Sequence, residues 1–462
     1  MAMEESSAFL QKNHKYLILV SVGLSSFMAA LDGSVVNTVL PVIRQYFNSD
    51  VATIEWTVVI YLLVLSSLLL SFGRLGDMLG HKRIFIAGFG VFVISSMLCG
   101  LSVSAWMLVT MRAIQAFGAA MMAANSPAIL TKNFPPNQRG QALGLGATMT
   151  YLGLVTGPSL GGMLAQHFGW RSIFYINVPV SLIGILFGIQ LIPKDHNGEQ
   201  NKEPFDLPGA LLFSVGLIAL LFSLNQGHAY GWGSGIILGG LILSGLLLAG
   251  FIAVERRTAK PMLDLSLFNN RIFSLSSISA VLNYISLYSI TFLMPFYLIQ
   301  GRGLNPAQAG LLLTAQPLLM AITAPLSGSL SDKIGTRLPA MLGMAILAIG
   351  LFLLSRLTPV TPLWYILLSL ATAGTGIGIF ISPNNSALMG AAPRNRQGIA
   401  AGVLATARSV GMVLGVGIAG AILTTVMAVS GDGLFQAIRL GYLAAMLFAI
   451  LGGFASAVRK NG

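Results

Sequence analysis

The stretch GRLGDMLGHKR at residues 73–83 decides the architecture of this chain, because a related stretch, GSLSDKIGTR, recurs at residues 328–337. Gly, Leu, Asp, Gly and a basic residue keep their register in both stretches. A second pair, PPNQRGQALG at residues 135–144 and PRNRQGIAAG at residues 393–402, matches at nearly the same offset. Two matches at nearly one offset predict that the chain consists of duplicated halves.

Composition places these halves in a membrane. The 462 residues are 55% hydrophobic and 9% charged, which is typical of a polytopic helical membrane protein. The apolar stretches lack the alternation of a membrane β-barrel, so helices are the spanning elements. At about 20 apolar residues per crossing, fourteen spans are predicted, at residues 16–41, 54–73, 83–102, 105–130, 140–165, 172–192, 208–226, 234–254, 272–300, 307–330, 338–356, 362–390, 397–428 and 434–457.

The distribution of positive charge predicts the orientation. Most Lys and Arg residues fall in predicted loops on the side that also holds both termini, and the positive-inside rule makes that side cytoplasmic. The net charge of +12 is explained by contact with anionic inner-leaflet lipids, so no nucleic-acid partner is expected. Because the repeated loops lie on one side, the repeat is parallel, with a pseudo-two-fold axis along the membrane normal.

The predicted fold is therefore an all-α integral membrane protein in the cytoplasmic membrane. Two six-helix bundles occupy residues 1–192 and 272–462. Two extra transmembrane helices lie between them at residues 208–254, joined by cytoplasmic linkers at residues 193–207 and 255–271.

Asp32 is the first candidate functional residue, because it lies alone inside an otherwise apolar helix. A carboxylate at bilayer depth is costly unless it is protonated, paired or facing water. A proton and a substrate cation can compete for such a group, which is the minimal mechanism of proton-coupled cation export. The alternative is a carboxylate that only pairs with a neighbouring helix.

Two arginines also fall inside predicted spans. Arg112 lies at a depth similar to that of Asp32, where it can tune a carboxylate or tie helix backbones together with its five donors. Arg408 lies in the C-terminal half, whose membrane core has no predicted acid. Its partner would be a carbonyl group, an amide such as Asn384 or Asn385, or a substrate anion.

Several motifs, in chain order, resemble those of the major facilitator superfamily, in its fourteen-helix drug:proton antiporter (DHA2) branch. Residues 73–83 resemble the signature loop between helices two and three, and residues 112–118 resemble the helix-four motif, with Ala at position 116 in place of the usual Gly. Residues 153–162 resemble the antiporter motif of helix five. Residues 31–41 and 170–179 resemble the helix-one and helix-six motifs of that branch.

The resemblance implies proton-coupled multidrug efflux by alternating access, with a small-molecule substrate, protons and membrane lipids as partners and a monomeric state. Lipophilic monovalent cations or neutral amphiphiles are the expected substrates. Three alternatives stay open: a dedicated exporter of one native metabolite, lipid or peptide, a proton-driven uptake symporter, and a non-transporting scaffold. One cysteine and scattered histidines offer no metal site, and no cofactor or enzymatic site is expected.

The predicted roles divide into three groups. Asp32 and Arg112 are expected to couple the proton. Gating residues are expected in the repeated loops and in helix five, where a four-residue glycine period permits close packing: Gly73, Arg74, Asp77, Gly80, Lys82, Arg83, Gly153, Gly157, Pro158, Gly161, Asp332 and Arg337. Aromatic, methionine and amide side chains are expected to line a central substrate cavity with Asp32: Phe27, Asn37, Tyr61, Asn125, Tyr151, Asn283, Tyr284, Tyr288, Phe292, Met294, Gln316, Asn384, Asn385 and Arg408. Glu55 is interpreted as an interfacial anchor or, alternatively, as a second acid at the cavity mouth.

Overall fold

The computed structural model describes residues 2–134, 139–193, 207–231, 233–256, 265–393, 397–429 and 433–459. The described part is helical throughout, and the side chains of Asp77 and Asp332 fall outside the description. The predicted linkers lie largely outside it as well. The N-terminal set of helices comprises α1 (Ala2–Phe47), α2 (Val51–Leu79), α3 (His81–Gly100), α4 (Ala105–Asn133), α5 (Arg139–Phe168), α6 (Ser172–Tyr175) and α7 (Asn177–Leu191).

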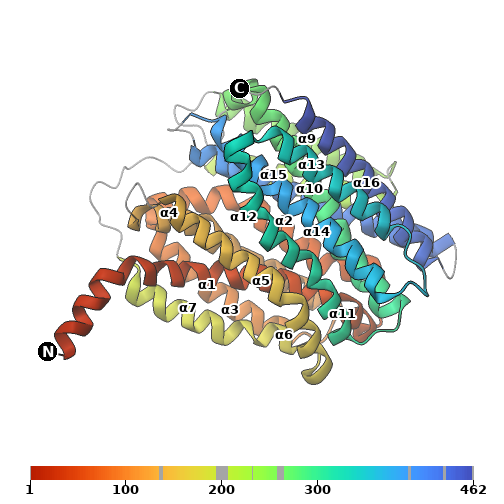
Figure 1. Cartoon of the computed structure of the whole chain (residues 1–462), viewed down its shortest axis with the longest axis horizontal. Helices are drawn as coiled ribbons and strands as arrows, with labels where there is room; N and C mark the ends of the chain where they lie inside the picture. The colour runs from red at the N-terminus through yellow and green to blue at the C-terminus, as the bar shows by residue number, and fades with distance from the viewer. Residues whose placement is uncertain are drawn as a thin grey trace.

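The later helices are α8 (Leu207–Tyr230) and α9 (Gly235–Glu255), followed by the short 3-10 helix η2 (Leu265–Asn269) and a C-terminal set. That set comprises α10 (Arg271–Pro295), the π-helix η3 (Phe296–Gly301), α11 (Pro306–Leu313), α12 (Ala315–Ile334), α13 (Arg337–Leu354), α14 (Leu363–Gly390), α15 (Gln397–Val429) and α16 (Leu434–Ala457). The red-to-yellow and green-to-blue helices of Figure 1 form the two sets.

Helix ends follow local sequence rules. Asp50 caps α2 by accepting a hydrogen bond from the Thr53 amide at 2.9 Å, as a side-chain oxygen at this position does for an unpaired N–H. Gly80 and Gly335 occupy matching places in the repeated stretches. Both have positive φ, 100° and 85°, and end α2 and α12. Glycine is required there because a side chain strains this conformation.

Twelve helices in the described residues are long and apolar enough to cross a membrane, and a shorter apolar helix covers Pro208–Leu224. The all-helical membrane class is therefore confirmed, whereas the count of fourteen spans stays a prediction. Two of the predicted spans are each one candidate span, Ser172–Leu191 and Pro306–Ser331, but each contains a break in the helix: Ile176 separates α6 from α7, and Thr314 separates α11 from α12.

The packing of the helices repeats between the two sets. α1 packs on α5 as α10 packs on α15, and α3 packs on α4 as α13 packs on α14. α2 likewise packs on α4, and α12 on α14. This recurrence agrees with duplicated halves. α8 packs against both α2 and α15, and α9 packs on α8.

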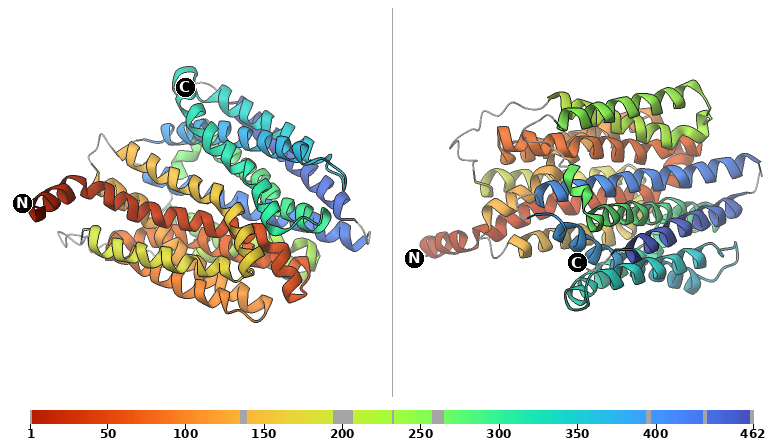
Figure 2. Two further views of the ribbon diagram at one scale, coloured as in Figure 1. Left: turned by 60° about the horizontal axis from the view of Figure 1, so that its bottom comes forward. Right: turned by 90° about the horizontal axis from the view of Figure 1, so that it is seen from above.

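The two sets meet most closely at one end of the molecule. There, Arg44 of α1 donates a hydrogen bond to Gln300 of η3 at 3.0 Å. We call this the Arg44 end. The starts of α1 and α10 lie at the opposite, terminal end, as do both chain termini. Figure 2 (left) shows the two sets inclined to each other and closest away from the termini.

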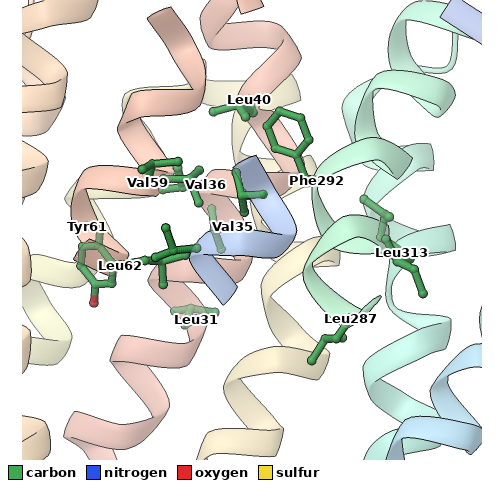
Figure 3. Packing of buried hydrophobic residues seen from close by; sticks show 14 of the residues in the cluster. Leu31, Val35, Val36, Leu40, Val59, Tyr61, Leu62, Leu287, Phe292 and Leu313 are labelled. Carbon is green, nitrogen blue, oxygen red and sulfur yellow. The ribbon is translucent and has the colours of Figure 1, made fainter. Parts of the chain in front are cut away.

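A continuous apolar core joins the sets near this contact. Figure 3 shows part of this core, and the side chains that it labels come from α1, α2, α10 and α11: Leu31, Val35, Val36, Leu40, Val59, Tyr61, Leu62, Leu287, Phe292 and Leu313. The core thus positions Asp32 and Tyr61, which lie beside these residues on the same helices, deep inside the N-terminal set.

Candidate functional site

Asp32 and Arg112 form a buried ion pair. The Arg112 Nη1 donates to the Asp32 Oδ2 at 2.5 Å. Asp32 on α1 is 2% exposed and Arg112 on α4 is 1% exposed. Both residues that were expected to couple the proton are therefore brought together. Because a buried charge is tolerated only when paired and hydrogen-bonded, each residue explains the presence of the other.

Amide side chains complete the shell of the carboxylate. Gln115 Nε2 donates to the Asp32 Oδ1 at 3.1 Å, and Asn177 Nδ2 donates to the same oxygen at 2.8 Å. Gln115 in turn accepts from Arg112 Nη1 at 2.6 Å. Every described partner of the carboxylate is an N–H donor, and one of these donors is charged.

The guanidinium is fixed from α2 as well. Arg112 Nε donates to the Thr57 carbonyl oxygen at 3.1 Å, and its guanidinium lies 4.2 Å from the centroid of the Tyr61 ring. An aromatic face attracts a cation most strongly where water is excluded. The cluster of Asp32, Arg112, Gln115, Tyr61 and Asn177, here called the Asp32 cluster, therefore ties together α1, α2, α4 and α7.

Arg408 lies in a different environment from Arg112. Its side chain is exposed although it belongs to a membrane helix, α15. Tyr284 and Tyr288 of α10 and Tyr151 of α5 lie within electrostatic range of its charge. Tyrosine side chains from both sets of helices therefore lie near Arg408.

The glycines of helix five do allow close packing, as their spacing predicted. A Cβ at Gly157 would lie 2.6 Å from the Cβ of Ser34, and one at Gly161 would lie 2.7 Å from Val35 Cγ1, both on α1. Real Cβ atoms do not approach so closely, so these positions require glycine.

The adjoining face of α5, one residue further along the helix, closes against the C-terminal set. A Cβ at Gly310 of α11 would meet the carbonyl group of Pro158, and one at Gly162 would meet that of Pro306. The Ser159 and Thr314 hydroxyls share a hydrogen bond at 2.5 Å. These backbone contacts and this hydrogen bond close the Arg44 end.

The signature loop docks within the N-terminal set. Lys82 donates to the Ile189 carbonyl oxygen at 2.7 Å and to that of Ile192, at the carboxyl end of α7. A cation is favourable at that end of a helix dipole. His81 shares a 2.8 Å hydrogen bond with Asn125. Arg83 and Arg337 are exposed, and the side chains of Asp77 and Asp332 are outside the described residues.

The residues expected to line the cavity differ in how far they are buried. Buried positions are Asp32, Asn37, Tyr61, Asn125, Asn283, Phe292, Met294, Gln316 and Asn384. Half-buried positions are Phe27, Tyr151, Tyr284, Tyr288 and Asn385, and Arg408 is exposed. In this conformation the predicted lining residues thus range from fully buried to exposed.

Asn384 illustrates an interior role. Its Oδ1 accepts from Arg459 Nη1 at 3.0 Å, and its Nδ2 donates to the Ser276 carbonyl oxygen at 3.0 Å. Burial lowers the pKa of Arg459 to about 10, which still leaves it charged at neutral pH. Asn384 therefore fixes the terminal end of the C-terminal set.

Sequence reasoning missed the roles of two residues and misplaced a third. Gln115 and Asn177 were visible as amides in apolar helices, but nothing in their spacing showed that they converge on Asp32. Glu55 is 0% exposed and lies directly against Gly420 of α15. The interpretation as an interfacial anchor does not fit this burial, which depends on α15 covering α2.

A protein-family model described as "Major Facilitator Superfamily" matches residues 22–266 and 276–460. The chain belongs to this superfamily. It is 36% identical over 404 residues to "Riboflavin transporter RibZ" of Clostridioides difficile (strain 630), covering 87% of this chain and 86% of that protein. It is 31% identical over 408 residues to "Multidrug resistance protein Stp" of Mycobacterium tuberculosis (strain CDC 1551 / Oshkosh), covering 88% and 75%.

The fold recurs in a solved structure. A bacterial homologue of the human lysosomal transporter Spinster has a TM-score of 0.68 at 16% identity, over 97% of both chains. The chain is therefore a multi-pass membrane transporter of the superfamily, in agreement with the coarse prediction.

Proposed function

We propose that this transporter exports small amphiphilic molecules in exchange for protons by alternating access, with Asp32 as the proton carrier. The observation that supports the proposal is the Asp32 cluster, because it pairs a titratable carboxyl group with a base that cannot release its proton. A purely structural core gains little from such a pair, since well-packed apolar residues can be as stable.

Protonation changes what the cluster can hold together. A proton on Asp32 removes the counter-ion of Arg112 and sets an O–H among N–H donors. Because Arg112 is buried and stays charged, the cluster must rearrange, and the helices that it joins must shift. Protonation is thereby converted into a change of helix packing.

A short packed path leads from Asp32 to the closed seam. Ser34 and Val35 follow Asp32 on α1 and lie against Gly157 and Gly161 of α5. Pro158, which directly follows Gly157 on α5, contacts Gly310 of α11. We propose that movement of α1 on protonation is transmitted through these glycines to the Arg44 end.

The geometry does not favour direct competition between a proton and a substrate cation. In this conformation Asp32 is enclosed by Arg112, Gln115 and Asn177, so a substrate cannot reach it. The proton and the substrate would then act on different groups, and coupling would occur through the helices between them.

The experiment uses the purified protein in liposomes with an imposed pH gradient. Export of carboxyfluorescein and of rhodamine 123, two xanthene dyes of opposite charge, is measured for wild type, Asp32→Asn and the matched control Asp50→Asn. Asp50 is an exposed helix cap, and asparagine also serves as a cap. Gradient-driven movement that only Asp32→Asn loses supports the proposal. Movement that survives Asp32→Asn contradicts it, as does dye moving in the same direction as the protons.

A dedicated transporter of one metabolite is the second candidate, favoured by the identity of 36% to a protein named as a riboflavin transporter. Riboflavin is fluorescent, so the same liposomes can report its movement. Transport of riboflavin without transport of either dye would favour this candidate over multidrug export.

A further inference from the structure

An exposed arginine in the interior of a transporter helix calls for an explanation. The membrane span of α15 covers Gly402–Ala428. Arg408 lies six residues inside it, or about 9 Å at 1.5 Å per residue. A charged side chain at such depth faces a wet or protein-lined space rather than hydrocarbon.

The helix geometry shows which space this is. At 100° per residue, Arg408 lies on nearly the same face of α15 as Gly415, and close to Gly411. A Cβ at Gly411 would lie 2.7 Å from the Cβ of Tyr284, and one at Gly415 would lie 3.0 Å from that of Tyr288. These glycines let α10 approach, so that its tyrosines stand beside Arg408.

A third tyrosine ring, beside those of Tyr284 and Tyr288, comes from the N-terminal set of helices. Tyr151 of α5 lies near enough to be influenced by both Arg408 and Tyr284. Tyr151, Tyr284 and Tyr288 are each only half buried. Arg408 therefore faces the seam between the two sets, with partly accessible aromatic rings from both.

Among the described residues, no carboxylate forms an ion pair with this arginine. α5, α10, α14, α15, α16 and α8 contain no Asp or Glu in their sequences. α2 carries only Glu55 and Asp77, near its two ends. Glu55 lies against Gly420, which is about 18 Å from Arg408 along α15.

We propose that Arg408, Tyr151, Tyr284 and Tyr288 form a substrate site for planar aromatic molecules that carry a carboxylate, a phenolate or clustered carbonyl oxygens. A guanidinium offers a planar fork of donors to such oxygens and stacks on aromatic faces. Tyrosine rings pack against a planar ligand, and their hydroxyls bind its polar edge. The inference rests on the proposed transport function and names its substrate class.

Charge separation makes this class suitable for proton exchange. The proton binds in the Asp32 cluster, and the anion binds at Arg408, so the two ligands do not compete for one group. In a cell whose interior is negative, both the exit of an anion and the entry of a proton follow the membrane potential. A lipophilic cation would instead meet the positive charge of Arg408.

Binding at equilibrium tests the proposal without any gradient. Fluorescence anisotropy of carboxyfluorescein and rhodamine 123 is measured against purified protein in an uncharged detergent. The variants are Arg408→Gln and Arg408→Lys, with Arg356→Gln as the matched control, because Arg356 is an exposed arginine of the same set near the Arg44 end. Tyr284→Phe is included as a milder change.

Wild type is expected to bind the anionic dye more tightly than the cationic dye. Arg408→Gln should weaken carboxyfluorescein binding roughly tenfold or more, a change of about 1.4 kcal/mol, whereas Arg356→Gln should leave it unchanged. Arg408→Lys should recover part of the affinity, because it keeps the charge but loses the fork. Tyr284→Phe should weaken binding less than Arg408→Gln.

Two results would overturn the proposal: rhodamine 123 bound as tightly as carboxyfluorescein by wild type, or carboxyfluorescein binding unaffected by Arg408→Gln. If Arg408→Gln does not fold, the same decision is made from Arg408→Lys and Tyr284→Phe, which must both weaken binding. Intact anion binding together with absent gradient-driven transport would refute only the proton-exchange function.

Discussion

Removing the charge of Asp32 should destabilise the transporter more than removing the charge of Arg112. In Asp32→Asn, Arg112 stays charged at 1% exposure without a counter-ion, and breaking a buried pair in this way costs about 3–5 kcal/mol. In Arg112→Met, the carboxylate keeps the donors of Gln115 and Asn177 and can also take up a proton, so the cost should be smaller.

The double variant Asp32→Asn with Arg112→Met leaves neither charge. Its cost should fall short of the sum of the single costs by about 0.5–3 kcal/mol, the range for residues in direct contact. Unfolding is followed by tryptophan fluorescence in mixed micelles as the fraction of denaturing detergent is raised. Additive single costs would refute the reasoning, because they would mean that the two groups do not stabilise each other.

Three further predictions concern residues around this cluster and the seam. Tyr61→Phe should leave the free energy of unfolding unchanged or raise it by about 1 kcal/mol, because the Tyr61 hydroxyl is buried with no hydrogen-bond partner among the described residues. A clearly lower free energy of unfolding for Tyr61→Phe than for wild type would contradict this. Cys99, the single cysteine, is buried with its thiol 3.7 Å from Gln115. Maleimide should label it slowly in wild type and faster once the Asp32 charge is removed, and equal rates would show that the cluster does not hold this region closed. Gly310→Ala should weaken closure of the Arg44 end by about 1–3 kcal/mol and slow dye transport, whereas Gly239→Ala, with open space around its Cβ, should not.

The sequence predicted the features that depend only on a residue's position along the helix axis. Duplicated loops gave the repeat, and the rise per residue placed Asp32 and Arg112 at similar depth, so their pairing was within reach. The glycine period of α5 likewise predicted close packing. These features need no knowledge of which neighbour covers which face.

Features that depend on rotation about the helix axis were not predictable in the same way. Arg112 and Arg408 both read as basic residues in apolar helices, yet one is enclosed and the other is exposed. The difference arises because α2 and α1 cover the face of α4 that carries Arg112, whereas Arg408 faces the seam. The burial of Glu55 depends in the same way on the missing side chain of Gly420 in another part of the chain.

Because of the position of α8, the two lines along which the N-terminal and C-terminal sets meet differ in what they present to the lipid. By packing on both α2 and α15, α8 screens the line along which these helices meet. Along the other line, where α5 meets α11 and α12, apolar side chains such as Leu311, Leu318 and Ile322 face outward. A compound dissolved in the bilayer would therefore meet α8 along one line between the two sets of helices, and exposed apolar side chains along the other line.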